Sequence, residues 1–155
     1  MFIAQACPVW WTIHIIGESD TINELKKIVR CLGLNNVMFY GTKTTDELNA
    51  LYNNFDIGLG CLALHRRNAD IDTTLNIIEY YCRGIPVVTS GISPLLDEKF
   101  TYRIVDNEDP IDIRQIYNFY RNLDINDLKH LSEIAREQFE WNNIFKNMLN
   151  KYEVQ

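Results

Sequence analysis

Short apolar runs alternate with amphipathic stretches along almost the whole chain. The runs are rich in β-branched and aromatic residues and end near a glycine or a polar turn, as buried strands do. The stretches between them place apolar residues three and four positions apart, which is typical of helices. The predicted strands cover 11–16, 37–40, 57–64, 85–89 and 102–105, and the predicted helices cover about 21–32, 44–55, 73–83, 109–121, 124–139 and 141–152.

Four of the predicted helices begin with a side chain suited to N-capping. Two starts are threonine–glutamate pairs with the spacing of a capping box, in which each side chain binds the backbone N–H of the other residue. A third is an aspartate directly before a proline, a residue favoured at the first helical position. These starts are Thr21 with Glu24, Thr44 with Glu47, Asp109 with Pro110, and Asp124.

Strands that alternate with helices, and that are apolar along their whole length, indicate a parallel sheet buried on both faces. The predicted fold class is therefore α/β, with a Rossmann-like parallel sheet of about five strands and helices on both faces. The chain has 155 residues, which is within the usual size of one domain. We expect residues 1–155 to form a single domain.

Composition narrows the functional classes. The net charge is −6, which argues against a general nucleic-acid-binding protein, because such proteins need a basic face. The four cysteines form no C-x-x-C motif, so a zinc site is not expected. The sequence shows neither a signal peptide nor an apolar stretch of membrane-spanning length. We therefore expect a cytoplasmic protein with no bound metal and no nucleic-acid partner.

In parallel sheets, ligands bind beyond the carboxyl ends of the strands, which directs attention to the polar turns after each predicted strand. The loop over 65–74 is the most polar of them. Thr73 and Thr74 begin the following helix, where free backbone N–H groups favour an anion. Capping by Asp72 or Thr73 alone is the simpler interpretation, and the two are compatible. The other turns are Gly17-Glu18-Ser19, Gly41-Thr42-Lys43 and Ser90-Gly91.

Glu79 is the strongest candidate for a binding residue. At 100° per residue, Leu75, Ile78 and Cys82 form one apolar stripe of the helix, and Glu79 lies at its edge. A carboxylate there could accept hydrogen bonds from two ribose hydroxyls. The alternative is a surface ion pair with Arg83 four residues later.

The basic residues His65, Arg66 and Arg67 could bind a phosphate or a sugar hydroxyl, because the planar guanidinium of arginine matches phosphate geometry. The alternative is a solvated basic turn. Of the other two histidines, His14 lies in a predicted strand and is expected to be a core residue with a hydrogen-bond partner. His130 is expected on a solvated helix face.

The order of these motifs resembles the C-terminal, nucleotide-sugar-binding domain of GT-B-fold retaining glycosyltransferases, the glycosyltransferase group 1 family. The resemblance covers about residues 10–152 and depends on the ordered set rather than on any one motif. The matching segments are Ile15-Ile-Gly17, Val37-Met-Phe-Tyr-Gly41, Glu47-Leu-Asn-Ala-Leu-Tyr52, Phe55-Asp-Ile-Gly-Leu59, Glu79-Tyr80, Gly84-Ile-Pro-Val-Val88 and Phe139-Glu-Trp141.

The resemblance implies roles for several residues. Glu79 matches the second glutamate of the family's E-x7-E motif, which holds the ribose. The backbone of Thr73, Thr74 and Leu75 would contact the diphosphate, and the loop Gly41-Thr42-Lys43 would lie against the nucleobase. The segment that ends in His65 and Arg66 resembles a loop found in one branch of these enzymes.

The sequence also departs from the family pattern. Ile71 stands where the first glutamate of E-x7-E is expected, with Asp70 and Asp72 beside it. Asn76 replaces the usual lysine. The domain's opening strand and its basic residues are not found, nor is the N-terminal acceptor domain, so we expect a fragment of a longer or split enzyme. The expected partners are a nucleotide sugar and that acceptor domain, and an uncovered sheet edge could also drive self-association.

The resemblance implies transfer of a sugar from a UDP- or GDP-sugar to a hydroxyl acceptor in glycan or surface polysaccharide synthesis. It further implies retention of the anomeric configuration, no metal or other cofactor, and an isolated chain that is inactive. Peripheral attachment to a membrane would occur through the missing domain. The alternative is a non-catalytic Rossmann-like binding or interaction module with a decayed donor site. A receiver-like or flavodoxin-like regulatory domain is a third interpretation.

Overall fold

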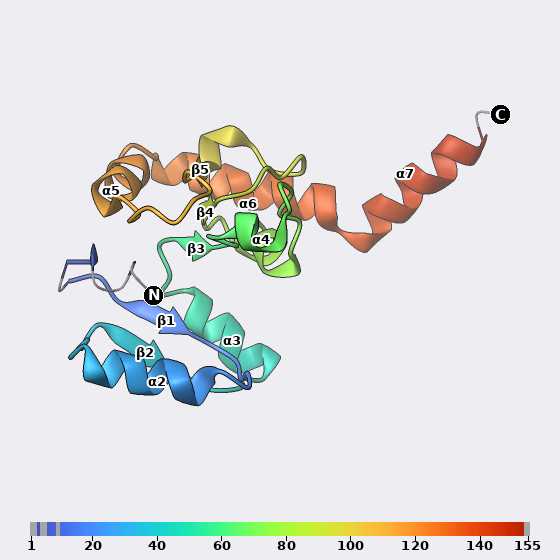
Figure 1. The fold of residues 1–155 in the computed structure, drawn as a ribbon. Helices are drawn as coiled ribbons and strands as arrows, with labels where there is room; N and C mark the ends of the chain where they lie inside the picture. Colours follow the sequence, from blue (N-terminus) through green and yellow to red (C-terminus); the bar gives the residue numbers. More distant parts are fainter. Residues whose placement is uncertain (1–2, 4–5, 9, 154–155) are drawn as a thin grey trace. The chain divides into compact units, whose positions relative to one another are not determined.

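A computed structural model of the chain describes residues 3, 6–8 and 10–153 (Figure 1). Its contacts divide the chain into two compact units. Unit 1 comprises Met1–Asn54 and Asp109–Arg114, and unit 2 comprises Phe55–Glu108 and Gln115–Gln155. Each unit contains parallel strands and helices, so the predicted α/β, Rossmann-like class is confirmed.

Unit 1 contains a two-stranded parallel sheet and two helices. Strand β1 (Ile13–Ile15) pairs with β2 (Val37–Phe39), with Ile13 opposite Val37. Helix α2 (Ile22–Cys31) connects the two strands, and α3 (Thr45–Tyr52) follows β2 (Figure 1). This strand–helix–strand order is the βαβ unit that alternating patterns favour.

The two capping boxes predicted in unit 1 have different outcomes. At α3 the box is confirmed, because Glu47 N–H donates to Thr44 Oγ1 and Thr44 N–H donates to Glu47 Oε2. At α2 the prediction is wrong, because Thr21 adopts a helical rather than an extended backbone. Its hydroxyl lies 3.2 Å from Ser19 Oγ instead. The spacing alone does not determine the backbone conformation that a cap requires.

Unit 2 contains a three-stranded parallel sheet in the order β3-β4-β5. The strands are β3 (Gly58–Leu59), β4 (Val87–Thr89) and β5 (Thr101–Arg103). Five strands were predicted and five are described, but they lie in two sheets rather than one. Within the sheets that the described residues form, β1 pairs only with β2, and β3 pairs only with β4. Strands β1 and β3 are therefore edge strands of their sheets.

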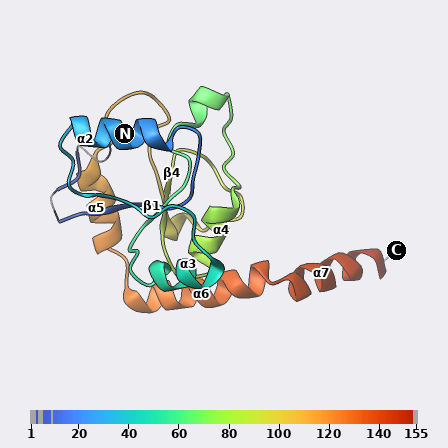
Figure 2. The same ribbon diagram turned by 90° about the horizontal axis from the view of Figure 1, so that it is seen from below.

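The helices of unit 2 are α4 (Leu75–Tyr81), α6 (Ile125–Phe139) and α7 (Trp141–Glu153), with the short 3-10 helices η1 (Leu64–Arg67) and η2 (Glu98–Phe100). Helix α5 (Ile113–Arg121) begins in unit 1 and ends in unit 2. Figure 2 shows α7 following directly after α6. The predicted starts of α6 and α7 are confirmed, with Asp124 accepting from Asn126 N–H at 2.6 Å.

The predicted start of α5 at Asp109 is wrong. The helix begins at Ile113, and Arg114 N–H donates to the Asp112 carboxylate at 2.9 Å. Asp112 therefore supplies the cap, and residues 109–112 belong to the connection that precedes the helix. Asp109 precedes Pro110 and Asp112 precedes Ile113, and both followers are suited to a first helical turn. The local pattern therefore did not distinguish the two aspartates.

The core of unit 2 forms where α4 and α6 meet the sheet. Its members are buried side chains that are at most 5% exposed, and they come from two helices, one strand and η2. They are Ile77, Tyr81, Val87, Phe100, Leu131 and Ala135. Gly84, between α4 and β4, adopts φ +70° and approaches α6 so closely that a Cβ would lie 2.5 Å from Leu128 O. This core fixes α4, the helix that carries the candidate binding residues.

Candidate functional site

A buried carboxylate lies at the carboxyl ends of β3 and β4. Asp72 is only 1% exposed. Its Oδ2 accepts from Cys61 N–H at 2.8 Å and from the Thr89 hydroxyl at 2.8 Å. Asp72 also pairs through its backbone, since its N–H donates to Ile92 O at 3.0 Å. Burial of a charge is tolerated only with such partners, so this carboxylate ties the polar loop to the ends of two strands.

The second oxygen of the same carboxylate holds the residue before α4. Asp72 Oδ1 accepts from the Thr74 hydroxyl at 3.0 Å and from Thr74 N–H at 3.4 Å. The N-cap of α4 is Thr74, in an extended conformation and without a side-chain cap of its own. The sequence had suggested Asp72 or Thr73 as the N-cap, and neither residue takes that position. Asp72 instead orients the N-cap residue.

Two glycines allow the chain to pass close to this carboxylate. A Cβ at Gly60 would lie 2.8 Å from Asp72 Oδ2 and 2.9 Å from Ile77 Cδ1. A Cβ at Gly91 would lie 2.8 Å from Asp72 Cβ. These distances are shorter than van der Waals contacts of a Cβ atom, so both positions need glycine to leave space around Asp72.

Helix α4 presents Glu79 on its exposed side. The predicted apolar stripe is wrong at Leu75, which is 78% exposed, whereas Ile77 and Tyr81 are the buried residues of the helix. Ile77 and Ile78 are both apolar, so the pattern did not determine which of them faces the core. Arg83 Nη1 donates to the Glu79 backbone carbonyl at 3.1 Å. Thr73 and Thr74 are also exposed.

The basic residues His65 and Arg66 are bound to two acidic residues that follow β5. His65 Nδ1 lies 2.8 Å from Asp106 Oδ1, and its Nε2 lies 2.8 Å from Glu108 Oε1. Arg66 Nε donates to Glu108 Oε1 at 2.7 Å, and Arg66 Nη2 donates to Glu108 Oε2. We call these four residues the His65–Glu108 cluster. Both ring nitrogens face carboxylates, and only the doubly protonated imidazole can donate to both.

The electrostatics of the cluster follow from these hydrogen bonds. The Glu108 and Asp106 carboxylates raise the pKa of His65, because both stabilise the imidazolium. In return, hydrogen bonds from Arg66 and His65 lower the pKa of Glu108 to about 2. The His65 contact also lowers the pKa of Asp106. The cluster therefore favours the charged form of each of its four side chains.

Sequence reasoning missed Asp106 and Glu108. The available signal was their position, since both follow the last predicted strand, and carboxyl ends of parallel strands share one edge of a sheet. The predicted strand ended at Val105 and the next predicted helix began at Asp109, so Asp106 and Glu108 lay in a short connection to which no role was assigned. The structure places this acidic segment beside η1.

Gly41, Thr42 and Lys43 belong to unit 1. Lys43 Nζ lies 3.1 Å from Glu47 Oε1, the carboxylate of the α3 capping box. Gly41 adopts φ +66°, a backbone region that favours glycine. The nucleobase contact expected of this loop stays a prediction.

The two remaining histidines are His14 in β1 and His130 in α6. His14 Nδ1 is 2.8 Å from Tyr40 Oη, and the two rings stack with centroids 5.5 Å apart. Partial burial lowers the pKa of His14, because it disfavours the charged ring. His130 is exposed on α6. The predicted hydrogen-bond partner of His14 and the solvated position of His130 are confirmed, whereas the core position of His14 is wrong, because the residue is only half-buried. Neither residue belongs to the candidate site.

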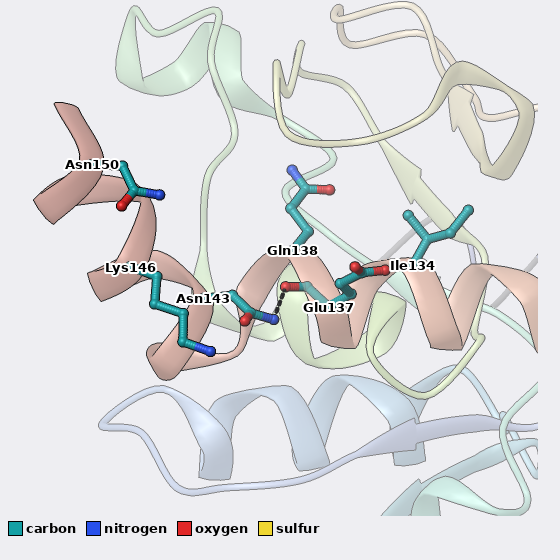
Figure 3. Close-up of a pocket in the computed structure, with 6 residues that line it drawn as sticks. All are labelled: Ile134, Glu137, Gln138, Asn143, Lys146 and Asn150. Atoms are coloured by element: carbon teal, nitrogen blue, oxygen red, sulfur yellow. Dashed lines mark hydrogen bonds between the residues drawn. The ribbon is translucent and has the colours of Figure 1, made fainter. Parts of the chain in front are cut away.

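A hollow of about 460 Å³ lies where α6 meets α7, and Figure 3 shows the side chains around it. Asn143 Nδ2 donates to Glu137 O at 2.8 Å across the corner between the helices. The lining residues are Ile134, Glu137, Gln138, Asn143, Lys146 and Asn150. None of the predicted site residues is among them, so the hollow is distinct from the candidate site.

Over residues 3, 6–8 and 10–153, no group of three or more His, Cys, Asp or Glu side chains could hold a metal ion. Over the same residues, no helix has both the length and the apolar character needed to cross a bilayer.

Comparison with known proteins identifies the family. The family model described as "Glycosyl transferases group 1" matches residues 2–118, which is more than half of the chain and includes α4 and the His65–Glu108 cluster. No curated protein matches the chain significantly. An α/β fold and a family match of this extent agree with the order of motifs in the sequence. The chain therefore belongs to the group 1 glycosyltransferase family.

Proposed function

We propose that the chain is the donor-binding, C-terminal half of a GT-B-fold retaining glycosyltransferase. It binds a UDP- or GDP-sugar, and the sugar passes to a hydroxyl acceptor in glycan or surface polysaccharide synthesis. Membership of the group 1 family supports a role in glycosyl transfer. The acceptor would be held by a separate domain, and the chain alone would be inactive.

The observation that carries the proposal is the exposed position of Glu79 on α4, inside the family-matched region. Ile77 and Tyr81 anchor the helix in the core, so the backbone that bears Glu79 is held in place. An ionised carboxylate is a pure acceptor and can take hydrogen bonds from both hydroxyls of a ribose. This supports Glu79 as the ribose-binding residue.

The diphosphate would bind next to this ribose. Thr73, Thr74 and Leu75 are exposed at the start of α4, and His65 and Arg66 supply positive charge on the same unit. In the proposed step, the bond between the sugar and the diphosphate breaks as the acceptor oxygen bonds to the sugar. The acceptor's proton passes to the leaving phosphate. Positive groups fixed at that phosphate would stabilise the developing charge, with no metal required.

Calorimetric titration of the chain with UDP and with GDP tests the proposal. We expect one nucleotide to bind and the Glu79→Ala variant to bind it at least about tenfold more weakly, because a charge-assisted hydrogen bond contributes about 1.5–3 kcal/mol. The matched control is Glu98→Ala, which removes an exposed carboxylate from η2 in the same unit. It should leave the affinity unchanged.

Equal affinities for the wild type and Glu79→Ala would contradict the assignment of Glu79. Absence of binding by either nucleotide to the folded chain would contradict the donor-binding role itself. Circular dichroism of each variant confirms that the comparison is between folded proteins.

A second candidate function is a non-catalytic binding or interaction module that retains the fold. The observation in its favour concerns the position of the first glutamate in the E-x7-E motif and the residue beside it. Ile71 is 60% exposed where a glutamate is expected, and the adjacent Asp72 is buried and holds Cys61, Thr74 and Thr89. Asp72 therefore cannot replace that glutamate without breaking the loop. A folded chain that binds neither nucleotide would favour this candidate.

A further inference from the structure

The Glu108 carboxylate is bound as a phosphate would be. One oxygen accepts from both His65 Nε2 and Arg66 Nε, and the other accepts from Arg66 Nη2. This two-pronged contact with guanidinium is the geometry that phosphate shares with carboxylate. We propose that Glu108 is an intramolecular competitor, which occupies the anion-binding groups of His65 and Arg66 until a diphosphate displaces it. The inference rests on the proposed function, because it concerns the same basic pair.

Exposure makes this displacement feasible. The side chains of Glu108 and Arg66 are 61% and 59% exposed. Water screens ion pairs at such positions, and their net contribution to stability is small. A diphosphate carries more negative charge than one carboxylate, so it can take over the same donors. Glu108 lies in the connection between β5 and α5, outside both elements, and can therefore move away without disturbing the sheet.

Asp106 differs from Glu108 and would remain in place. Its side chain is 21% exposed, against 61% for Glu108, and its Oδ1 lies 2.8 Å from His65 Nδ1. Asp106 is therefore a positioning residue, which stays hydrogen-bonded to His65 Nδ1 and orients the ring after Glu108 leaves.

The test is a calorimetric titration of the full chain with pyrophosphate. In the Glu108→Gln variant the competitor loses its charge, so we expect pyrophosphate to bind about two- to tenfold more tightly than to the wild type. The control Glu98→Gln changes the net charge of unit 2 equally but lies on η2, and it should alter the affinity less than about twofold. In the double variant Arg66→Ala/Glu108→Gln, the gain in affinity for pyrophosphate should disappear.

An unchanged or weaker affinity in Glu108→Gln overturns the inference, as does a gain of equal size in Glu98→Gln. Persistence of the gain without Arg66 also overturns it. The UDP and GDP titrations of wild type and Glu79→Ala report separately on the proposed function. A Glu79-dependent nucleotide site with no Glu108 effect on pyrophosphate would retain the function and reject the competitor. A Glu108 effect on pyrophosphate without nucleotide binding would retain the competitor and reject the donor role.

Discussion

Asp72 and Glu108 are both carboxylates that accept several hydrogen bonds in unit 2, but they differ in exposure and in the kind of donor. Asp72 is 1% exposed and accepts from a backbone N–H and from hydroxyls. Glu108 is 61% exposed and accepts from an imidazole and a guanidinium. The first arrangement replaces water completely, whereas the second competes with water at every contact.

Two hydrogen-bond networks of similar composition can therefore have different roles, one structural and one in ligand exchange. Removing a buried acceptor leaves its donors without partners, and the cost is the full desolvation of those donors. Removing an exposed one lets water take its place. The Asp72 network is therefore suited to hold the start of α4 in one geometry. The His65–Glu108 cluster is suited to exchange its anion.

The largest expected effect is from Asp72→Ala. The Cys61 N–H and the Thr89 hydroxyl would lose a buried acceptor, so the free energy of unfolding should fall by about 2–4 kcal/mol. Urea denaturation measures the change. The control Asp70→Ala removes an exposed carboxylate two residues earlier and should cost less than about 0.5 kcal/mol. Similar losses in the two variants would contradict a structural role confined to Asp72.

The next effect is steric and concerns Gly60. A Cβ there would press on Asp72 Oδ2 and Ile77 Cδ1, so Gly60→Ala should destabilise the protein by about 1–3 kcal/mol in thermal or urea unfolding. Part of the clash is with the carboxylate itself. The cost should therefore be smaller, by about 0.5 kcal/mol or more, when the substitution is made in the Asp72→Ala background. Strict additivity of the two substitutions would show that the crowding does not involve Asp72.

The smallest effect concerns the exposed cluster and depends on pH. The folded state raises the pKa of His65 above its ordinary value of 6.5, through Glu108 first and Asp106 second. The charged ring therefore stabilises the fold fully below the unfolded pKa, and this contribution is lost as pH rises through the folded pKa. The stability difference between wild type and His65→Gln should therefore shrink as the pH rises above the ordinary value of 6.5.

Urea midpoints for the two proteins across this pH range measure the change. The same series for His130→Gln controls for the loss of one imidazole from the surface of unit 2. A difference between wild type and His65→Gln that does not vary with pH would mean that the ring contributes by packing rather than by charge. The comparison between a buried, neutral-donor network and an exposed, charged one would then no longer hold.

The sequence by itself determined the α/β class, the positions of nearly all strands and helices, and the family. These depend on local patterns, because periodicity, caps and glycines act over a few residues. It also predicted a hydrogen-bond partner for His14 and a solvated helix face for His130. It did not determine which of two capping boxes forms, or whether Asp109 or Asp112 begins α5, because several local patterns there were equally suitable.

Only the tertiary structure decided which face of α4 is buried and what the charged side chains near it do. Asp72 meets Cys61 and Thr89 across 11 and 17 residues of chain, and His65 meets Asp106 across 41. Such partners are selected by how strands and loops pack, which no window of sequence contains. The exposure that separates a fixed carboxylate from a displaceable one is likewise a property of the folded surface.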